Sequence, residues 1–249
     1  MDLDHVTLVI RPRSAWEAMD LGCRVAVKWF GRLWRLWLVT GLPTGLIGCL
    51  IALKYPRLAV VLIWWLKPIH EPLLLYWLSR AVFGETLPVR PVAGKWRWIL
   101  GPHLLRLITR DRFLPERSFL MPVRFLEGGT RETRRQRHRV LGKKQSGGLW
   151  LTGACLAVEG VICLSIILLA LFLVPESMRM AVDYHSPFAF PLFYVAAYLA
   201  AVSIIAPFYV TGGFMLYISR RVDLEAWDLE IGFKKMADRA AAHRGDHAG

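Results

Sequence analysis

The ionisable residues most able to support chemistry in this sequence lie inside an apolar run. Residues 58–83 are mostly apolar or aromatic, yet Lys67, His70 and Glu71 occupy their middle. The hydrocarbon core of a bilayer is about 30 Å thick, and roughly 20 helical residues cross it. A continuous crossing would therefore place these three groups near the midplane, where charged side chains are costly and normally face protein or water.

Two prolines interrupt the same run. Pro68 and Pro72 have no backbone N–H, so a helix through them loses two of its hydrogen bonds. Lys67 and Glu71 are four residues apart and can pair on one helix face. One interpretation is a broken membrane helix with a polar site at the midplane, as in many secondary transporters. The other, which the sequence favours, is a short span followed by an interfacial helix, with Lys67, His70 and Glu71 at headgroup level.

Glu159 is a second acidic residue within an apolar segment, near the centre of residues 149–174. An acid at that depth is costly unless it is neutral or paired. Its natural partners are Lys67 and His70, so the sequence predicts a contact between the second and third apolar segments. Such a pair is structural by default, and it becomes a proton or ion relay only where water reaches it.

The motifs of common enzyme and metal sites are absent from the sequence. His70-Glu71 lacks the second histidine of the HExxH zinc motif, and there is no GxSxG, P-loop or GxGxxG sequence. The four cysteines form no CxxC pair and show neither zinc spacing nor a disulfide framework. We therefore expect no enzyme activity, no cofactor, and no catalytic or metal-binding residue.

The composition of the chain is that of a membrane protein. Its 249 residues are 55% hydrophobic, and the mean hydropathy of +0.38 is too high for an ordinary soluble domain. The sequence predicts an all-α, polytopic fold with about four transmembrane helices, at residues 33–53, 58–83, 149–174 and 191–217. The N-terminus has no long apolar core, so we expect no cleavable signal peptide.

Positive charge is concentrated in one segment. The formal net charge is +13, and residues 80–148 hold 16 Lys and Arg against five Asp and Glu. Such an excess normally marks a cytoplasmic segment beside anionic lipid headgroups, which places both termini in the cytoplasm as well. The pattern does not favour nucleic-acid binding, because the cationic stretch lacks interleaved aromatic residues for base stacking.

The spans and the charge pattern divide the chain into five parts. Ser14 and Glu17 form a capping box, which predicts a helix start in the N-terminal part. Within the basic segment, the pattern predicts a short helix at 103–113, an extended stretch at 117–129 and a cationic helix at 130–144. The five parts are a cytoplasmic N-terminal segment with an amphipathic helix (1–32), a first transmembrane hairpin broken at 67–72 (33–83), a basic cytoplasmic segment (84–148), a second transmembrane hairpin (149–217), and a cytoplasmic helix with a disordered tail (218–249).

Two cytoplasmic surfaces are candidates for binding. The cationic helix would attract anionic lipid or an acidic partner. The C-terminal helix has apolar residues on two opposite stripes, which is typical of a helix that packs between two bodies. The candidate contact residues are Arg131, Arg134, Arg135, Arg137, Trp227 and Ile231.

Three stretches resemble a group of uncharacterised bacterial integral inner-membrane proteins. They are RPRSAWEAMDLG at 11–22, RSFLMPVRFLEG at 117–128 and RRVDLEAWDLEIGF at 220–233. The group is associated with operons that encode a transglutaminase-like membrane protein and a MoxR-type ATPase. The resemblance implies a bacterial inner-membrane protein within an envelope complex, and it transfers no catalytic residue.

Two functional hypotheses follow. The leading one is a non-catalytic inner-membrane scaffold or complex subunit, which docks protein partners or anionic lipid through its cytoplasmic layer. The alternative is a small transporter or channel subunit that uses Lys67, His70, Glu71 and Glu159. The alternative requires a homo-oligomer, because four helices enclose little volume.

Overall fold

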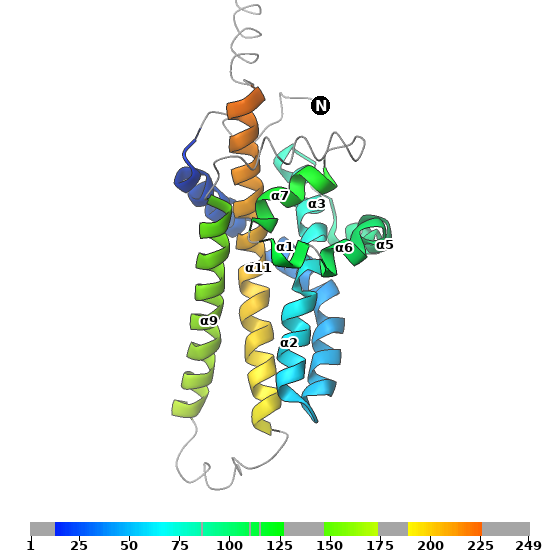
Figure 1. Ribbon diagram of the computed structural model, residues 1–249, viewed down its shortest axis with the longest axis vertical. Coiled ribbons are helices and arrows are strands. Elements are labelled where there is room, and N and C mark those ends of the chain that lie inside the picture. The colour runs from blue at the N-terminus through cyan, green and yellow to red at the C-terminus, as the bar shows by residue number, and fades with distance from the viewer. Residues whose placement is uncertain are drawn as a thin grey trace, which may run out of the picture.

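The computed structural model describes residues 13–85, 87–109, 111–114, 116–126, 147–173 and 189–225. These residues form helices joined by short turns, and none of them is in a strand. Four helical segments are long and apolar enough to cross a membrane: Ala15–Ala52, Pro56–Val82, Gly147–Leu173 and Pro191–Asp223. The predicted all-α, polytopic membrane fold with four spans is confirmed (Figure 1).

The helices form a membrane bundle and a layer of short elements beside its upper half in Figure 1. The bundle contains α1 (Ala15–Ala52), α2 (Pro56–Leu66), the 3₁₀ turn η2 (Lys67–Ile69), α3 (Glu71–Val82), α9 (Gly147–Leu173) and α11 (Ala189–Glu225). The layer contains α4 (Val89–Gly94), α5 (Trp96–Leu100), η3 (Gly101–His103), α6 (Leu104–Ile108), η4 (Asp111–Phe113) and α7 (Arg117–Phe125).

Helix α1 begins where the capping box predicted. The Ser14 hydroxyl accepts a hydrogen bond from the Glu17 N–H at 3.3 Å. The helix continues to Ala52 with a kink at Trp29, whose φ of −114° and ψ of 16° are not helical. The predicted N-terminal helix and first span are therefore one kinked element. The kink allows its first part to lie obliquely across the bundle (Figure 1).

Small residues on α1 admit its neighbours, as the sequence suggested. Gly45 packs against Leu199 of α11, and Gly48 packs against Ile63 of α2. A methyl group at Gly48 would lie 2.7 Å from the end of the Ile63 side chain. Close approach of this kind is typical of membrane helices, where packing replaces the hydrophobic effect as the main source of association.

The second span breaks inside the predicted interval 67–72. Helix α2 ends at Leu66, the chain makes a 3₁₀ turn over Lys67–Ile69, and α3 begins at Glu71. Pro68 and Pro72 explain the break, because neither can donate to the carbonyl one turn earlier. The two helices remain close enough in line for Pro56–Val82 to form one 27-residue candidate span.

The prediction of an extended stretch at 117–129 is wrong over its first part, because Arg117–Phe125 forms the helix α7. Pro122 lies within this helix, although proline disfavours the interior of a helix. Burial overrides that local preference, since Phe119, Leu120 and Val123 pack into the core. The predicted helix at 103–113 is also divided, into α6 and η4.

Helix α11 is central to the bundle and contacts α1, α9 and α7. Its contact with α7 is very close: a methyl group at Gly213 would lie 2.5 Å from the backbone of Ser118. Helix α9 packs mainly on α11 and exposes most of its surface (Figure 1). The cationic helix predicted at 130–144 and the C-terminal residues 226–249 lie outside the described residues.

Large apolar side chains are exposed on the layer beside the bundle. Trp98 of α5 is 71% exposed, Leu105 of α6 is 81% exposed and Phe113 of η4 is 71% exposed. These residues lie outside the four spans, on helices of three to five residues that also carry arginine. Exposed aromatic and cationic residues together are typical of the membrane–water interface.

Candidate functional site

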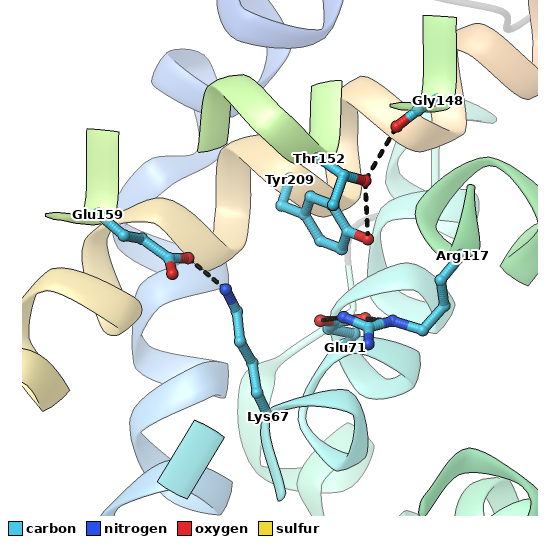
Figure 2. Close-up of polar contacts among 7 residues, drawn as sticks. All are labelled: Lys67, Glu71, Arg117, Gly148, Thr152, Glu159 and Tyr209. Carbon is cyan, nitrogen blue, oxygen red and sulfur yellow. Dashed lines mark hydrogen bonds and ion pairs between the residues drawn. The ribbon is translucent and has the colours of Figure 1, made fainter. Parts of the chain in front are cut away.

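Lys67 of η2 and Glu159 of α9 form a buried ion pair (Figure 2). The side chains of Lys67 and Glu159 are 6% and 4% exposed. The contact predicted between the second and third apolar segments is therefore present. The break in the second span enables it, because the 3₁₀ turn directs Lys67 sideways toward α9.

Glu71, at the start of α3, pairs with Arg117, at the start of α7. Arg117 donates from Nε to Glu71 Oε2 at 3.0 Å and from Nη2 to Oε1 at 2.5 Å. This bidentate geometry is the strongest form of arginine–carboxylate contact. The possible Lys67–Glu71 pair does not form, and each residue has a partner on another helix. Arg117 was not among the predicted site residues.

Tyr209 of α11 lies beside both ion pairs (Figure 2). Lys67 Nζ is 5.8 Å and the Arg117 guanidinium carbon 5.5 Å from the centre of its ring, within the range of cation–π attraction. The Tyr209 hydroxyl is 3.4 Å from the Thr152 hydroxyl, which donates to the Gly148 carbonyl at 2.9 Å. These contacts connect α9 and α11 to the same site.

We call Lys67, Glu71, Arg117 and Glu159 the ionic cluster. Its two cations and two carboxylates balance, and each is at most 7% exposed. Burial lowers the pKa of Arg117, but Glu71, Tyr209 and Glu159 together outweigh burial and raise that pKa. The ionic cluster joins the adjacent elements η2 and α3 to α7 and α9, which lie far from them in the sequence.

His70 belongs to the same turn but not to the ionic cluster. It is 4% exposed, and its ring packs edge-on against the Trp37 ring at a centroid distance of 5.6 Å. Its Nδ1 atom has no hydrogen-bond partner within the described part of the chain. His70 was a candidate partner for Glu159, and that interpretation is wrong because the ring points toward α1 instead of α9.

Asp111 of η4 forms a further buried ion pair that sequence reasoning missed. Its side chain is fully buried and pairs with Arg124 of α7, with Arg106 Nε 3.6 Å away. Arg124 is 7% exposed, so this pair is also inside the protein. The contact fixes η4 against α7, although nothing in the local sequence pattern distinguishes Asp111 from an exposed loop residue.

The structure does not describe the remaining predicted site residues. Arg131, Arg134, Arg135, Arg137, Trp227 and Ile231 lie outside the described residues, so their role as lipid or partner contacts stays a prediction. Among the residues that the structure describes, no three His, Cys, Asp or Glu side chains gather in a way that could hold a metal ion.

The two ion pairs of the ionic cluster hold helices together. A buried pair that loses one partner destabilises a protein by about 3–5 kcal/mol, because the remaining charge is left without compensation. Two such pairs within one cluster make the positions of η2, α3, α7 and α9 interdependent.

No protein-family model, curated protein or solved structure matches the chain.

Proposed function

We propose that the protein is a non-catalytic, multi-pass subunit of a bacterial inner-membrane complex, with a scaffolding role. The observation that carries this proposal is that all four groups of the ionic cluster are paired within the chain and almost fully buried. An ion or proton path needs groups that exchange with water, and intramembrane charges that serve one normally face a water-filled cavity. The ionic cluster instead fixes the layer of short helices onto the membrane bundle.

The exposed surface of α9 supports a role as a subunit. Only 11% of its most apolar stretch of 18 residues is buried, although the same helix carries the buried Glu159. Val161, Leu168 and Phe172 are among its exposed side chains, at 62%, 54% and 83% exposure. A helix that packs on α11 along one face and is exposed over its other faces can pack against lipid or against a helix of another subunit.

The cellular placement rests on the sequence. The cations of residues 80–148 support a cytoplasmic location for that segment and for both termini. The three stretches at 11–22, 117–128 and 220–233 support a bacterial inner membrane through their resemblance. The protein partners would bind on the cytoplasmic side and along α9.

The test compares the wild type with a variant that has no charge at one pair, Lys67→Met/Glu159→Leu. Replacing a buried ion pair with apolar residues of similar size is often neutral or stabilising. Both proteins are extracted from native membranes in polymer-bounded lipid discs and their composition is determined by mass spectrometry. We expect the same second polypeptide at the same ratio in both.

The transporter hypothesis predicts a different result. It predicts that both proteins are homo-oligomers without a second polypeptide, and that ion or proton flux in proteoliposomes is present for the wild type and absent for the double variant. That result would contradict the proposed scaffolding role.

A further inference from the structure

A cavity of about 240 Å³ lies next to the ionic cluster, between α2, α9, α11 and the η4–α7 segment. Its lining includes Trp64 of α2, Lys67, Arg112 of η4, Arg117, Leu156 of α9 and Tyr209. Pockets for drug-sized ligands usually measure roughly 300–1,000 Å³. This cavity therefore has room for one polar group of a ligand and not for a large molecule.

Among the described residues that form the cavity and the ionic cluster, the charges do not balance. Lys67 and Arg117 are matched by Glu159 and Glu71, which leaves Arg112 as an additional cation. The Nε and Nη2 atoms of Arg112 are buried and have no hydrogen-bond acceptor within the described part of the chain. These two atoms form the same edge with which Arg117 holds Glu71. A desolvated guanidinium edge without an acceptor is costly, so an anion there would stabilise the protein.

Arg112 also contacts an aromatic side chain. Its guanidinium lies over the Trp64 ring, 3.4 Å from the centroid. Burial lowers the pKa of Arg112, and the positive charge of Arg117 lowers it further, while Glu71, Tyr198 and Tyr209 act in the opposite direction. Arginine remains charged through shifts of this kind, since its reference pKa lies far above physiological pH.

Arg112 is held in this place by its neighbour. Asp111 is fully buried and paired with Arg124 of α7, with Arg106 close by. That anchor fixes the η4 backbone, and Arg112 is the next residue. The cation at the cavity is therefore positioned by the fold in advance of any ligand.

The rim of the cavity is apolar and exposed. Phe113, Leu156 and Trp64 all line the cavity, and they are 71%, 47% and 38% exposed. Leu156 and Trp64 belong to candidate spans, and Phe113 belongs to η4 in the layer beside the bundle. A ligand at this position would have a polar head inside the cavity and apolar chains along α2 and α9.

We propose that this cavity binds the phosphate group of an anionic membrane lipid, with Arg112 as the main cationic contact. Arginine suits this role because its planar fork binds phosphate oxygens in pairs. Free phosphate offers the same oxygens, but it has no apolar chains that could contact the apolar rim. This inference does not depend on the scaffolding role.

The test uses delipidated, full-length protein in a non-ionic detergent. Phosphatidylglycerol, phosphatidylcholine and inorganic phosphate are titrated separately, and binding is followed by native mass spectrometry and by the thermal unfolding midpoint. We expect phosphatidylglycerol to bind and to raise the midpoint, and the other two to do neither. Arg112→Gln is expected to weaken phosphatidylglycerol binding roughly tenfold or more, the loss of one charge-assisted contact.

Two further variants make the result specific. Arg97→Gln removes a cation from the exposed α5 helix, outside the cavity, and should retain affinity to within about twofold. Leu156→Trp keeps every charge but narrows the rim, and should weaken binding even if Arg112→Gln does not fold.

An equal loss of affinity for phosphatidylglycerol in Arg97→Gln and Arg112→Gln would overturn the proposal, because binding would then depend only on overall charge. Equal binding of phosphatidylcholine would also overturn it. Protection by inorganic phosphate alone, at the same affinity as the lipid, would overturn the assignment to a lipid.

Discussion

Lys67 and Glu159 form an ion pair inside the membrane bundle although 92 residues separate them in the sequence. The pair joins the 3₁₀ turn that breaks the second span to the centre of the third. It lies beside the Glu71–Arg117 pair, so one site determines where four elements meet (Figure 2). We regard this ionic cluster as the structural centre of the protein.

Glu159→Gln should destabilise the protein by about 3–5 kcal/mol, because Lys67 would stay buried without a counter-charge. The free energy of unfolding in mixed micelles measures the effect. Glu85→Gln is the matched control: Glu85 pairs with Arg80, but the two side chains are 61% and 44% exposed. Such exposed pairs contribute roughly 0–1 kcal/mol, so equal losses in the two variants would contradict the interpretation.

Arg117→Met should loosen α7 from the bundle. The substitution leaves the Glu71 carboxylate buried without its bidentate partner. We expect faster amide hydrogen exchange across Arg117–Phe125, and a loss of about 3–5 kcal/mol in stability. Arg117→Lys should recover only part of this loss, because an ammonium cannot bind both carboxylate oxygens in the same way. Full recovery with lysine would show that charge alone matters at this position.

Gly213→Ala should displace α7 from α11. The added methyl group would lie 2.5 Å from backbone and side-chain atoms of Ser118, a distance that requires the helices to move apart. We expect a lower unfolding midpoint. Gly160→Ala on α9 is the control, since nothing lies within 4 Å of the methyl group there. That substitution should leave the midpoint unchanged or raise it slightly, because alanine favours helix more than glycine does. A similar fall in both variants would argue against the close α7–α11 contact.

The predicted orientation has a direct readout. A reporter that is active only outside the cytoplasm, fused after residue 182, should be active, and the same reporter fused after residue 249 should be inactive. The reason is the excess of cations in residues 80–148, which favours their retention in the cytoplasm. A reporter that is inactive after residue 182 would contradict the proposed placement of both termini.

The sequence predicted the elements better than their contacts. Hydropathy identified the four spans, and Pro68 and Pro72 marked the break, because both signals depend on neighbouring residues only. The Lys67–Glu159 contact was predictable since an acid within an apolar helix needs a cation, and few were available. The partner of Glu71 was not predictable in this way, since Arg117 is one of many arginines in the basic segment.

Two failures have a common physical reason. The possible Lys67–Glu71 pair assumed α-helical spacing, but the chain makes a 3₁₀ turn with three residues per turn, so residues four apart face different directions. The stretch at 117–129 contains Pro122, which disfavours a helix locally, whereas Arg117–Phe125 packs on α11 as a helix. In both places tertiary contacts decide the backbone conformation, and local sequence does not contain them.

The most direct test of the structural role of the ionic cluster is a double-mutant cycle on Lys67 and Glu159. The free energy of unfolding is measured for the wild type, Lys67→Met, Glu159→Leu and the double variant. We predict that each single substitution is strongly destabilising and that the double variant is close to wild type, with a coupling energy at or above the roughly 0.5–3 kcal/mol usual for contacting residues. If the two losses in the free energy of unfolding simply add in the double variant, the two side chains do not interact. That result would contradict the proposed ionic cluster.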